Sequence, residues 1–235
     1  MKRNAIRSLV VMMIAVMVFA LTPVPVSAAS KAPGKVKKVS VKVTSAVSTT
    51  TNKTTVVIKW KKAKKATGYI IWAKHGTGEW VKQKKVGKRY TKLKLLNVPA
   101  GQLDVKVQAV NKKKKGKFSA IKSKFIASNT TFERYVKSIN FSYLRDIENA
   151  AKDKGFTTSV SGNTVTFTCD LAADGYTLSD SDIAKLEPTA SADLAKRNVF
   201  AQELQNEIRL DTGISGVKVA FKYMYGAKTV ASKTF

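Results

Sequence analysis

The stretch VVIKWKKAKKATGYIIWAK, residues 56–74, alternates apolar and polar residues on either side of a lysine-rich segment. The alternating apolar positions are Val56, Ile58 and Trp60 before that segment, and Tyr69, Ile71 and Ala73 after it. A period of two is typical of strands that bury one face, and the spacing of an amphipathic helix is absent. The stretch therefore predicts two β-strands joined by a turn.

The same alternation continues along the chain in both directions. Residues 39–43 (VSVKV) precede the opening stretch, and residues 103–111 (LDVKVQAVN) alternate again after it. Turn signals separate these runs at HGTGE (75–79) and at VPAG (98–101). About seven short strands fit into about 95 residues, and this spacing is typical of a two-sheet β-sandwich.

Four segments of this half resemble the fibronectin type III domain found in many secreted Gram-positive bacterial proteins. They are VVIKW (56–60), ATGYIIWAK (66–74), LLNVPAG (95–101) and LDVKVQAVN (103–111). The resemblance covers residues 32–126 and implies an immunoglobulin-like sandwich with Trp60 on strand B. It also implies that Gly68-Tyr69 opens strand C and that Asn111 ends strand F. The family usually has a tyrosine at the start of strand F, where this chain has Leu103, so the hydroxyl bond to the preceding corner is not expected.

Charge divides the chain into two halves. Residues 29–128 contain 27 lysines and arginines against two acids, Glu79 and Asp104, whereas residues 129–235 contain 13 basic and 13 acidic residues. The change falls at the polar stretch ASNTT (127–131). We therefore predict a basic sandwich domain over 29–128 and a second domain over 129–235.

The N-terminus has the pattern of a secretory signal peptide. Lys2, Arg3 and Arg7 precede the apolar run Leu9–Leu21. This run is shorter than the roughly 20 apolar residues that a membrane-spanning helix needs. Val26-Ser27-Ala28 supplies small residues for cleavage, so residues 1–28 are the predicted signal peptide. No cysteine for a lipid anchor follows the run, and no second apolar span appears downstream. The mature chain is expected to be soluble, secreted, and extracellular or cell-wall associated.

The segment NKKKKGKFSAIKSKF (111–125) is compatible with a nuclear localisation signal, a nucleic-acid-binding surface, a disordered basic tail or one edge of a folded domain. Export excludes the first, and the fibronectin register places a turn at Asn111–Lys117 and a strand at Phe118–Phe125. The charge is expected to continue across the sheet faces, because the outward parity of their strands holds Lys59, Lys92, Lys94 and Lys106. The predicted basic patch consists of Lys92, Lys94, Lys106, Lys112, Lys113, Lys114, Lys115, Lys117, Lys122 and Lys124.

Two explanations of this charge stay open. Lysines can simply solvate a surface and protect sheet edges against strand addition. A net charge of +25 on one small domain nevertheless raises self-repulsion, so an anionic partner explains the asymmetry better. Candidate partners are wall teichoic acid, an acidic glycan, anionic lipid and, non-specifically, extracellular DNA, which all bind by counterion release. Trp72 and Trp80 flank HGTGE and could stack on sugars or bases, although packing on the sheet is the favoured role.

The spacing of apolar residues changes in the second half, from two to three and four. Apolar residues from Phe132 to Ala151 recur at three and four, Thr130 and Glu133 suggest a capping box, and a second helix is predicted at Ser191–Asp211. Hairpins are predicted at 156–171 and 217–235. This order, αββαββ, predicts an α+β domain with both helices on one face of a four-stranded antiparallel sheet. The ending VKVAFKYMYGAKTVASKTF (217–235) is similar to a small α+β family of unknown function in exported Clostridial proteins, over about 131–235.

Patterns for catalysis are weak. The stretch DLAADGYTLSDSD (170–182) places Asp170 and Asp174 as two calcium ligands, but carboxylates are lacking at two further positions, so no metal site is predicted. His75 is the single histidine and would have to reach a nucleophile in the other half. Cys169 shares parity with its apolar neighbours and is expected to be buried and unreactive. No enzyme activity and no cofactor are predicted.

The sequence thus favours an exported, non-enzymatic binding protein whose basic sandwich attaches to an anionic polymer or surface. In the alternative, the sandwich is a spacer and the second domain is the specific binder or an unrecognised enzyme. The sequence identifies no protein partner for the second domain.

Overall fold

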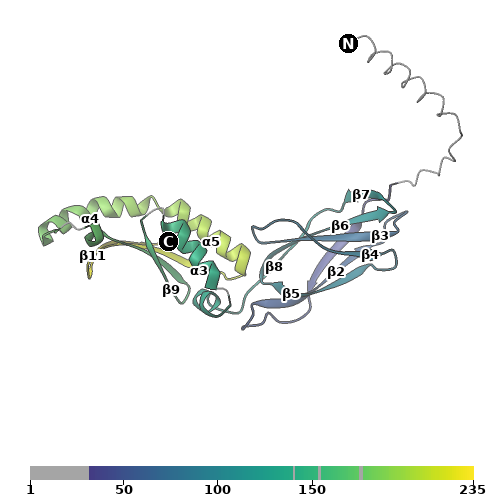
Figure 1. Ribbon diagram of the computed structural model, residues 1–235, viewed down its shortest axis with the longest axis horizontal. Helices are drawn as coiled ribbons and strands as arrows, with labels where there is room; N and C mark the ends of the chain where they lie inside the picture. The colour runs from purple at the N-terminus through teal and green to yellow at the C-terminus, as the bar shows by residue number, and fades with distance from the viewer. Residues whose placement is uncertain (1–31, 140, 153–154, 175–176) are drawn as a thin grey trace, which may run out of the picture. The chain divides into compact units, whose positions relative to one another are not determined.

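The computed structural model describes residues 32–139, 141–152, 155–174 and 177–235 (Figure 1). The predicted signal peptide, residues 1–28, lies outside these described residues. Residues Ala32–Phe235 form one compact unit that contains two separate clusters of buried apolar side chains. One cluster belongs to the strands up to Ile126, and the other to the elements from Phe132 onward.

The N-terminal strands form two sheets. The first contains β1 (Lys37–Val43), β2 (Lys53–Lys61) and β5 (Lys92–Pro99), in the order β1-β2-β5. The second contains β4 (Val81–Gly87), β3 (Gly68–His75), β6 (Gly101–Asn111) and β7 (Lys114–Phe118), in the order β4-β3-β6-β7, and β8 (Lys122–Ile126) also pairs with β6. All these pairs are antiparallel. β5 and β4 are therefore edge strands, and the turn at residues 88–91 joins them.

The alternating residues of the opening stretch fill the space between these sheets, as the sequence predicts. Val56 and Ile71 are fully buried, and Trp60 packs edge to face against Tyr69 with ring centroids 5.5 Å apart. The Tyr69 hydroxyl accepts a hydrogen bond from the Ala63 N–H (3.1 Å) in the β2–β3 turn. The tyrosine therefore connects a lysine-rich turn to the core.

The last strand of the sandwich differs from the prediction. The expected single strand Phe118–Phe125 is divided into β7 and β8. The Ser119 N–H donates to Val107 O (2.9 Å), and the Ser119 hydroxyl accepts from the Val107 N–H (3.0 Å), so this serine interrupts the ladder. The turn is also shorter than predicted, because it contains Lys112 and Lys113 while β7 begins at Lys114.

One of two facing glycines permits the close approach of β4 to β3. Gly68 and Gly87 are register partners. A Cβ on Gly68 would lie 2.7 Å from Val86 O, whereas a Cβ on Gly87 would meet nothing within 4 Å. We expect Gly68→Ala to lower the free energy of unfolding by about 1–3 kcal/mol through overpacking. Gly87→Ala is the matched control and should change it by less than about 0.5 kcal/mol. Urea denaturation measures both, and equal losses would contradict this account.

The second half contains four strands and several helical segments. They are α2 (Phe132–Arg134), a π-helical turn (Tyr135–Ile139), α3 (Phe141–Lys152), β9 (Thr157–Ser161), β10 (Thr164–Asp170), a 3-10 turn (Leu171–Asp174), α4 (Asp180–Ala195), α5 (Asn198–Thr212), β11 (Lys218–Tyr225) and β12 (Lys228–Thr234). The strand order is β12-β11-β10-β9. Residues of α3 and α5 share one buried cluster with Phe167 and Phe221, so these two helices pack on the same face of the sheet.

The sheet is mixed, and the prediction of a fully antiparallel sheet is wrong. The outer pairs are antiparallel, but β10 and β11 are parallel, with Phe167 opposite Phe221. A parallel pair needs a long crossover connection, and α4 and α5 supply it. The sequence pattern of two hairpins did not reveal how the second hairpin joins the first.

The helices also begin and end elsewhere than predicted. The expected helix Ser191–Asp211 is two helices, because α4 starts at Asp180 behind a capping box formed by Ser179 and Asp182. Thr131, rather than Thr130, caps the first helix. The carboxylate of Glu133 instead accepts a hydrogen bond from the Gly162 N–H (2.6 Å), so it joins the helix to the β9–β10 turn.

Hydrogen bonds connect the two halves of the compact unit. The Asn52 side-chain amide donates to Thr212 O (2.8 Å), and the Ser128 N–H donates to Gly213 O (2.9 Å). The Thr77 N–H donates to the Asp211 carboxylate (2.7 Å). These bonds join the end of α5 to the turns of the sandwich. Independent folding of residues 29–128 and 129–235 stays a prediction.

Candidate functional site

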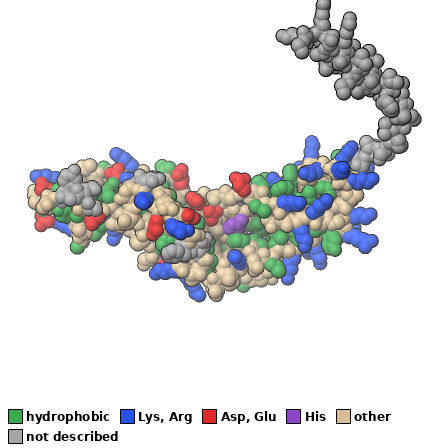
Figure 2. Space-filling model, viewed as in Figure 1, with side chains coloured by type: hydrophobic (Ala, Val, Ile, Leu, Met, Phe, Trp, Pro, Cys, Tyr) green, Lys and Arg blue, Asp and Glu red, His purple; other side chains and the backbone are tan. Residues whose placement is uncertain are grey.

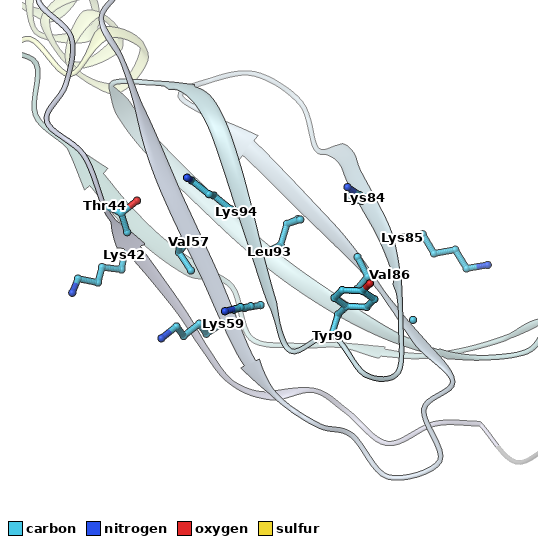
Figure 3. Close-up of a pocket in the computed structure, with 12 residues that line it drawn as sticks. Lys42, Thr44, Val57, Lys59, Lys84, Lys85, Val86, Tyr90, Leu93 and Lys94 are labelled. Carbon is cyan, nitrogen blue, oxygen red and sulfur yellow. The ribbon is translucent and has the colours of Figure 1, made fainter.

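A lysine-lined groove of about 910 Å³ crosses the outer face of the first sheet and reaches β4 (Figure 3). Six lysines line it: Lys42 on β1, Lys59 on β2, Lys84 and Lys85 on β4, and Lys92 and Lys94 on β5. Apolar atoms between them come from Val57, Val86, Leu93 and Tyr90. The outer face of one sheet and the edge strand β4 of the other therefore contribute cations to one hollow.

Strand pairing explains why these lysines gather. Lys42 and Lys94 are the register partners of Val57 on either side, so they flank this valine on the outward face. Lys59 and Lys92 lie directly opposite each other. Like charges in directly opposite positions destabilise a sheet. Folding alone does not favour this arrangement, whereas a bound anion would offset its repulsion.

An exposed tyrosine stands at the end of the groove. The turn from β4 to β5 is closed by a hydrogen bond from the Tyr90 N–H to Gly87 O (3.1 Å). The Tyr90 side chain is 61% exposed, and it lines the same groove as Val86 (Figure 3). Aromatic rings in cationic grooves provide flat surfaces for stacking. Tyr90 could therefore contact a ring of a bound polymer.

The groove contains no acidic residue among those that line it. Across residues 32–139, 141–152, 155–174 and 177–235, every ion pair lies in the second half of the chain, between Glu133 and Lys228. The two acids of the sandwich lie elsewhere: Glu79 is in the β3–β4 turn, and Asp104 on β6 accepts a hydrogen bond from the Gln102 side chain (3.0 Å). The groove thus presents uncompensated positive charge.

The structure distributes the predicted basic patch over several surfaces. Lys92 and Lys94 lie in the groove. Lys112 and Lys113 form the β6–β7 turn, Lys114, Lys115 and Lys117 lie on β7, and Lys122 and Lys124 lie on β8. The sequence analysis missed Lys42, Lys84, Lys85 and Tyr90. The outward parity of Lys42 and Lys59 could have been recognised in the sequence. The approach of β4 to this face, which brings in Lys84 and Lys85, could not.

The remaining patch residue, Lys106, has an internal role. Its ammonium group lies 4.0 Å from the centre of the Trp80 ring and 4.6 Å from that of Phe118. Trp72 packs edge to face against Phe118, with ring centroids 6.3 Å apart. Trp72 and Trp80 are partly buried in this cluster. The arrangement fits the packing role of the two tryptophans, because the protein itself already occupies one face of Trp80.

The other candidate residues make hydrogen bonds or packing contacts within the fold. His75 Nε2 lies 2.8 Å from Ala100 O, near the end of α5. The Asp170 carboxylate accepts hydrogen bonds from the N–H groups of Ala172 (3.0 Å) and Gly226 (3.1 Å). Within the described ranges no three His, Cys, Asp or Glu side chains are grouped so as to hold a metal ion. Cys169 is half-buried against the core rather than fully buried, because it lies near the end of β10.

A polar cluster joins α4 to β11. The Tyr223 hydroxyl donates to Asp193 Oδ2 (2.7 Å), and the Arg197 guanidinium contacts the same oxygen (3.1 Å). The Tyr223 and Arg197 hydrogen bonds lower the pKa of the Asp193 carboxyl, and burial together with Asp193 raises the pKa of Tyr223. Arg197 also lies over the Phe156 ring. These groups satisfy one another, so the cluster serves to hold helix and sheet together.

No protein-family model matches the chain, and no curated protein matches it. One similar solved structure, described as "Structure of FN3tt mut", covers 40% of this chain and 97% of its own, with 14% identity and a TM-score of 0.32. The chicken CNTN1 FN1-FN3 domains cover 39% of this chain and 30% of their own, with 22% identity and a TM-score of 0.32. These similar structures are fibronectin type III domains. In the described part of the chain, no helix is both long and apolar enough to cross a membrane.

Proposed function

We propose that this is an exported, non-enzymatic binding protein whose sandwich holds a linear anionic polymer in the lysine-lined groove. The observation that carries the proposal is the presence of six lysines, and of no acid, among the residues that line one hollow of about 910 Å³. Opposed Lys59 and Lys92 support it, because a ligand phosphate or carboxylate between them would convert repulsion into attraction. Wall teichoic acid or an acidic glycan has the required repeating charge. The protein would then be secreted and associated with the cell wall.

Binding of this kind has a defined dependence on salt. Each neutralised lysine releases counterions from the polymer, so the logarithm of the affinity falls linearly with the logarithm of salt concentration. For about six neutralised charges on a flexible polyanion, a slope near −0.7 per charge gives a loss of roughly 300-fold between about 50 and 200 mM salt. Titration of the chain from Ala29 onward with purified teichoic acid measures this slope. Dextran, a neutral polymer, is the control.

Two results would refute the proposal. One is binding to teichoic acid and heparin that does not change with salt. The other is equal binding to dextran, because this would show recognition of the sugar rather than of charge.

The alternative assigns the specific binding to the second half, with the sandwich as a spacer. One hollow there supports it: Tyr143 and Ile147 on α3 and Leu204 on α5 line a small groove of about 180 Å³. Glu207 lies at its rim, and burial raises the pKa of this carboxyl. The groove is about five times smaller than the one on the sandwich, so it would take a side chain rather than a polymer.

A further inference from the structure

The order of the strands places alternate turns at opposite ends of the sandwich. The turns at residues 62–67, 88–91 and 112–113 lie at one end, and those at 44–52, 76–80 and 100 lie at the other. The first three turns contain seven basic residues, which we call the lysine pole: Lys62, Lys64, Lys65, Lys88, Arg89, Lys112 and Lys113. The opposite turns contain one charged residue, Glu79. Charge is therefore polarised along the strands.

Hydrogen bonds join two of the three turns of this pole. The Thr67 N–H donates to Val110 O (2.8 Å), and the Lys112 N–H donates to the Thr67 hydroxyl (3.1 Å), so two of the turns are joined. The Gly34 N–H donates to Lys64 O (2.9 Å), which brings the start of the described chain to the same end. All seven basic side chains are exposed. Figure 2 shows basic side chains crowded at this end of the sandwich.

The two ends of the sandwich have different surroundings. The turns at the end opposite the pole bond to the second half of the chain through Asn52 and Thr77. The lysine pole lies at the other end of the strands and contains no acid among its turn residues. None of its seven basic side chains lines the groove. They can instead lie against a flat anionic surface.

We infer that the lysine pole docks on a lipid bilayer that contains anionic headgroups. Each lysine or arginine close to an anionic leaflet strengthens the attraction, and the effect is lost beyond a Debye length. The arrangement of the pole favours a bilayer over a linear polymer. Its seven exposed cations lie together at one end of the domain and none of them lines the groove, so one flat anionic surface can contact them at the same time. The inference is separate from polymer binding in the groove.

The test compares two variants that lose the same number of charges. The pole variant is Lys62→Gln, Lys64→Gln, Lys88→Gln, Arg89→Gln, Lys112→Gln and Lys113→Gln. The groove variant is Lys42→Gln, Lys59→Gln, Lys84→Gln, Lys85→Gln, Lys92→Gln and Lys94→Gln. Both are made in the chain from Ala29 onward, which keeps every described residue and lacks the apolar run. Co-sedimentation measures binding to phosphatidylcholine vesicles with and without phosphatidylglycerol.

We expect the parent chain to bind vesicles only when phosphatidylglycerol is present. The pole variant should bind them at least about 100-fold more weakly, and the groove variant less than about 10-fold more weakly. An equal loss in both variants would show that binding follows net charge, and would overturn the inference. The inference would also be overturned if the parent chain bound vesicles equally with and without phosphatidylglycerol, or did not bind them at all. If the six-site pole variant fails to fold, Lys88→Gln with Arg89→Gln should still lose about 10-fold or more.

Discussion

Replacing the six groove lysines by glutamine is expected to weaken binding to a linear polyanion by about 100-fold or more at low salt. Glutamine keeps the length and polarity of the side chain but cannot neutralise a phosphate or carboxylate. With six contacts removed, the slope of log affinity against log salt should become shallower by about 4, because each contact contributes about 0.7. The melting temperature should stay constant or rise slightly, since the opposed Lys59 and Lys92 no longer repel each other. Titration with teichoic acid or heparin at several salt concentrations measures the change.

The pole variant is the matched control for this prediction. It loses six charges from the same domain, but at residues that do not line the groove. We expect it to lose less than about 10-fold in polymer affinity. The two variants therefore exchange roles between polymer and vesicle assays. Similar losses in the polymer assay would contradict a groove and indicate diffuse attraction by a charged domain. Failure of the polymer prediction would leave the vesicle prediction standing, because the two rest on different residues.

The sequence was sufficient to predict the sandwich because its signal is local. Alternating residues such as Val56 and Ile71 repeat within single strands, and a strand with one buried face needs this period. The same parity correctly places Lys92 and Lys94 on the outward face of β5. Charge segregation also needs no structure, because the composition changes within a few residues of the ASNTT stretch. These features depend on neighbours along the chain.

The groove could not be predicted in the same way because it depends on pairing between distant strands. Lys42 and Lys94 flank Val57 only through the register of three strands. Lys84 and Lys85 join them because β4, at the edge of the other sheet, approaches β5. A run such as Lys112–Lys115 attracts notice in the sequence, yet the structure divides it between a turn and a strand. Spacing along the chain was a poor guide to which cations share a surface.

In the second half, too, the pairing of distant strands could not be predicted from the sequence. The two hairpins were recognisable from alternation, but the parallel pairing of β10 with β11 was not. The helix boundaries between the hairpins were also mispredicted, for two reasons. Pro188 lies inside α4, and the chain between α4 and α5 turns at Lys196 and Arg197 without a glycine or proline. A proline usually indicates a helix boundary, so the sequence suggested one helix where the structure has two.

Phe167→Ala is expected to lower the free energy of unfolding by about 3–5 kcal/mol, the largest loss that we predict for stability. Phe167 is 1% exposed and lies on the parallel strand pair, where its ring stacks on Phe221 with centroids 5.2 Å apart. It also packs edge to face against Phe200 of α5 at 5.6 Å. Removing this ring leaves a cavity between sheet and helix that neighbouring aromatic rings cannot fill, since they are held by their own contacts.

Two variants in the same half control for this prediction. Phe167→Leu keeps most of the volume, so its cost should stay well below that of the alanine variant. Val199→Ala removes an apolar side chain that is 63% exposed on α5 and should change the stability by less than about 0.5 kcal/mol. Urea denaturation followed by far-UV circular dichroism measures all three. A small loss for Phe167→Ala would contradict the parallel β10–β11 pairing as the centre of this core, because a ring at the edge of a sheet could be removed at little cost.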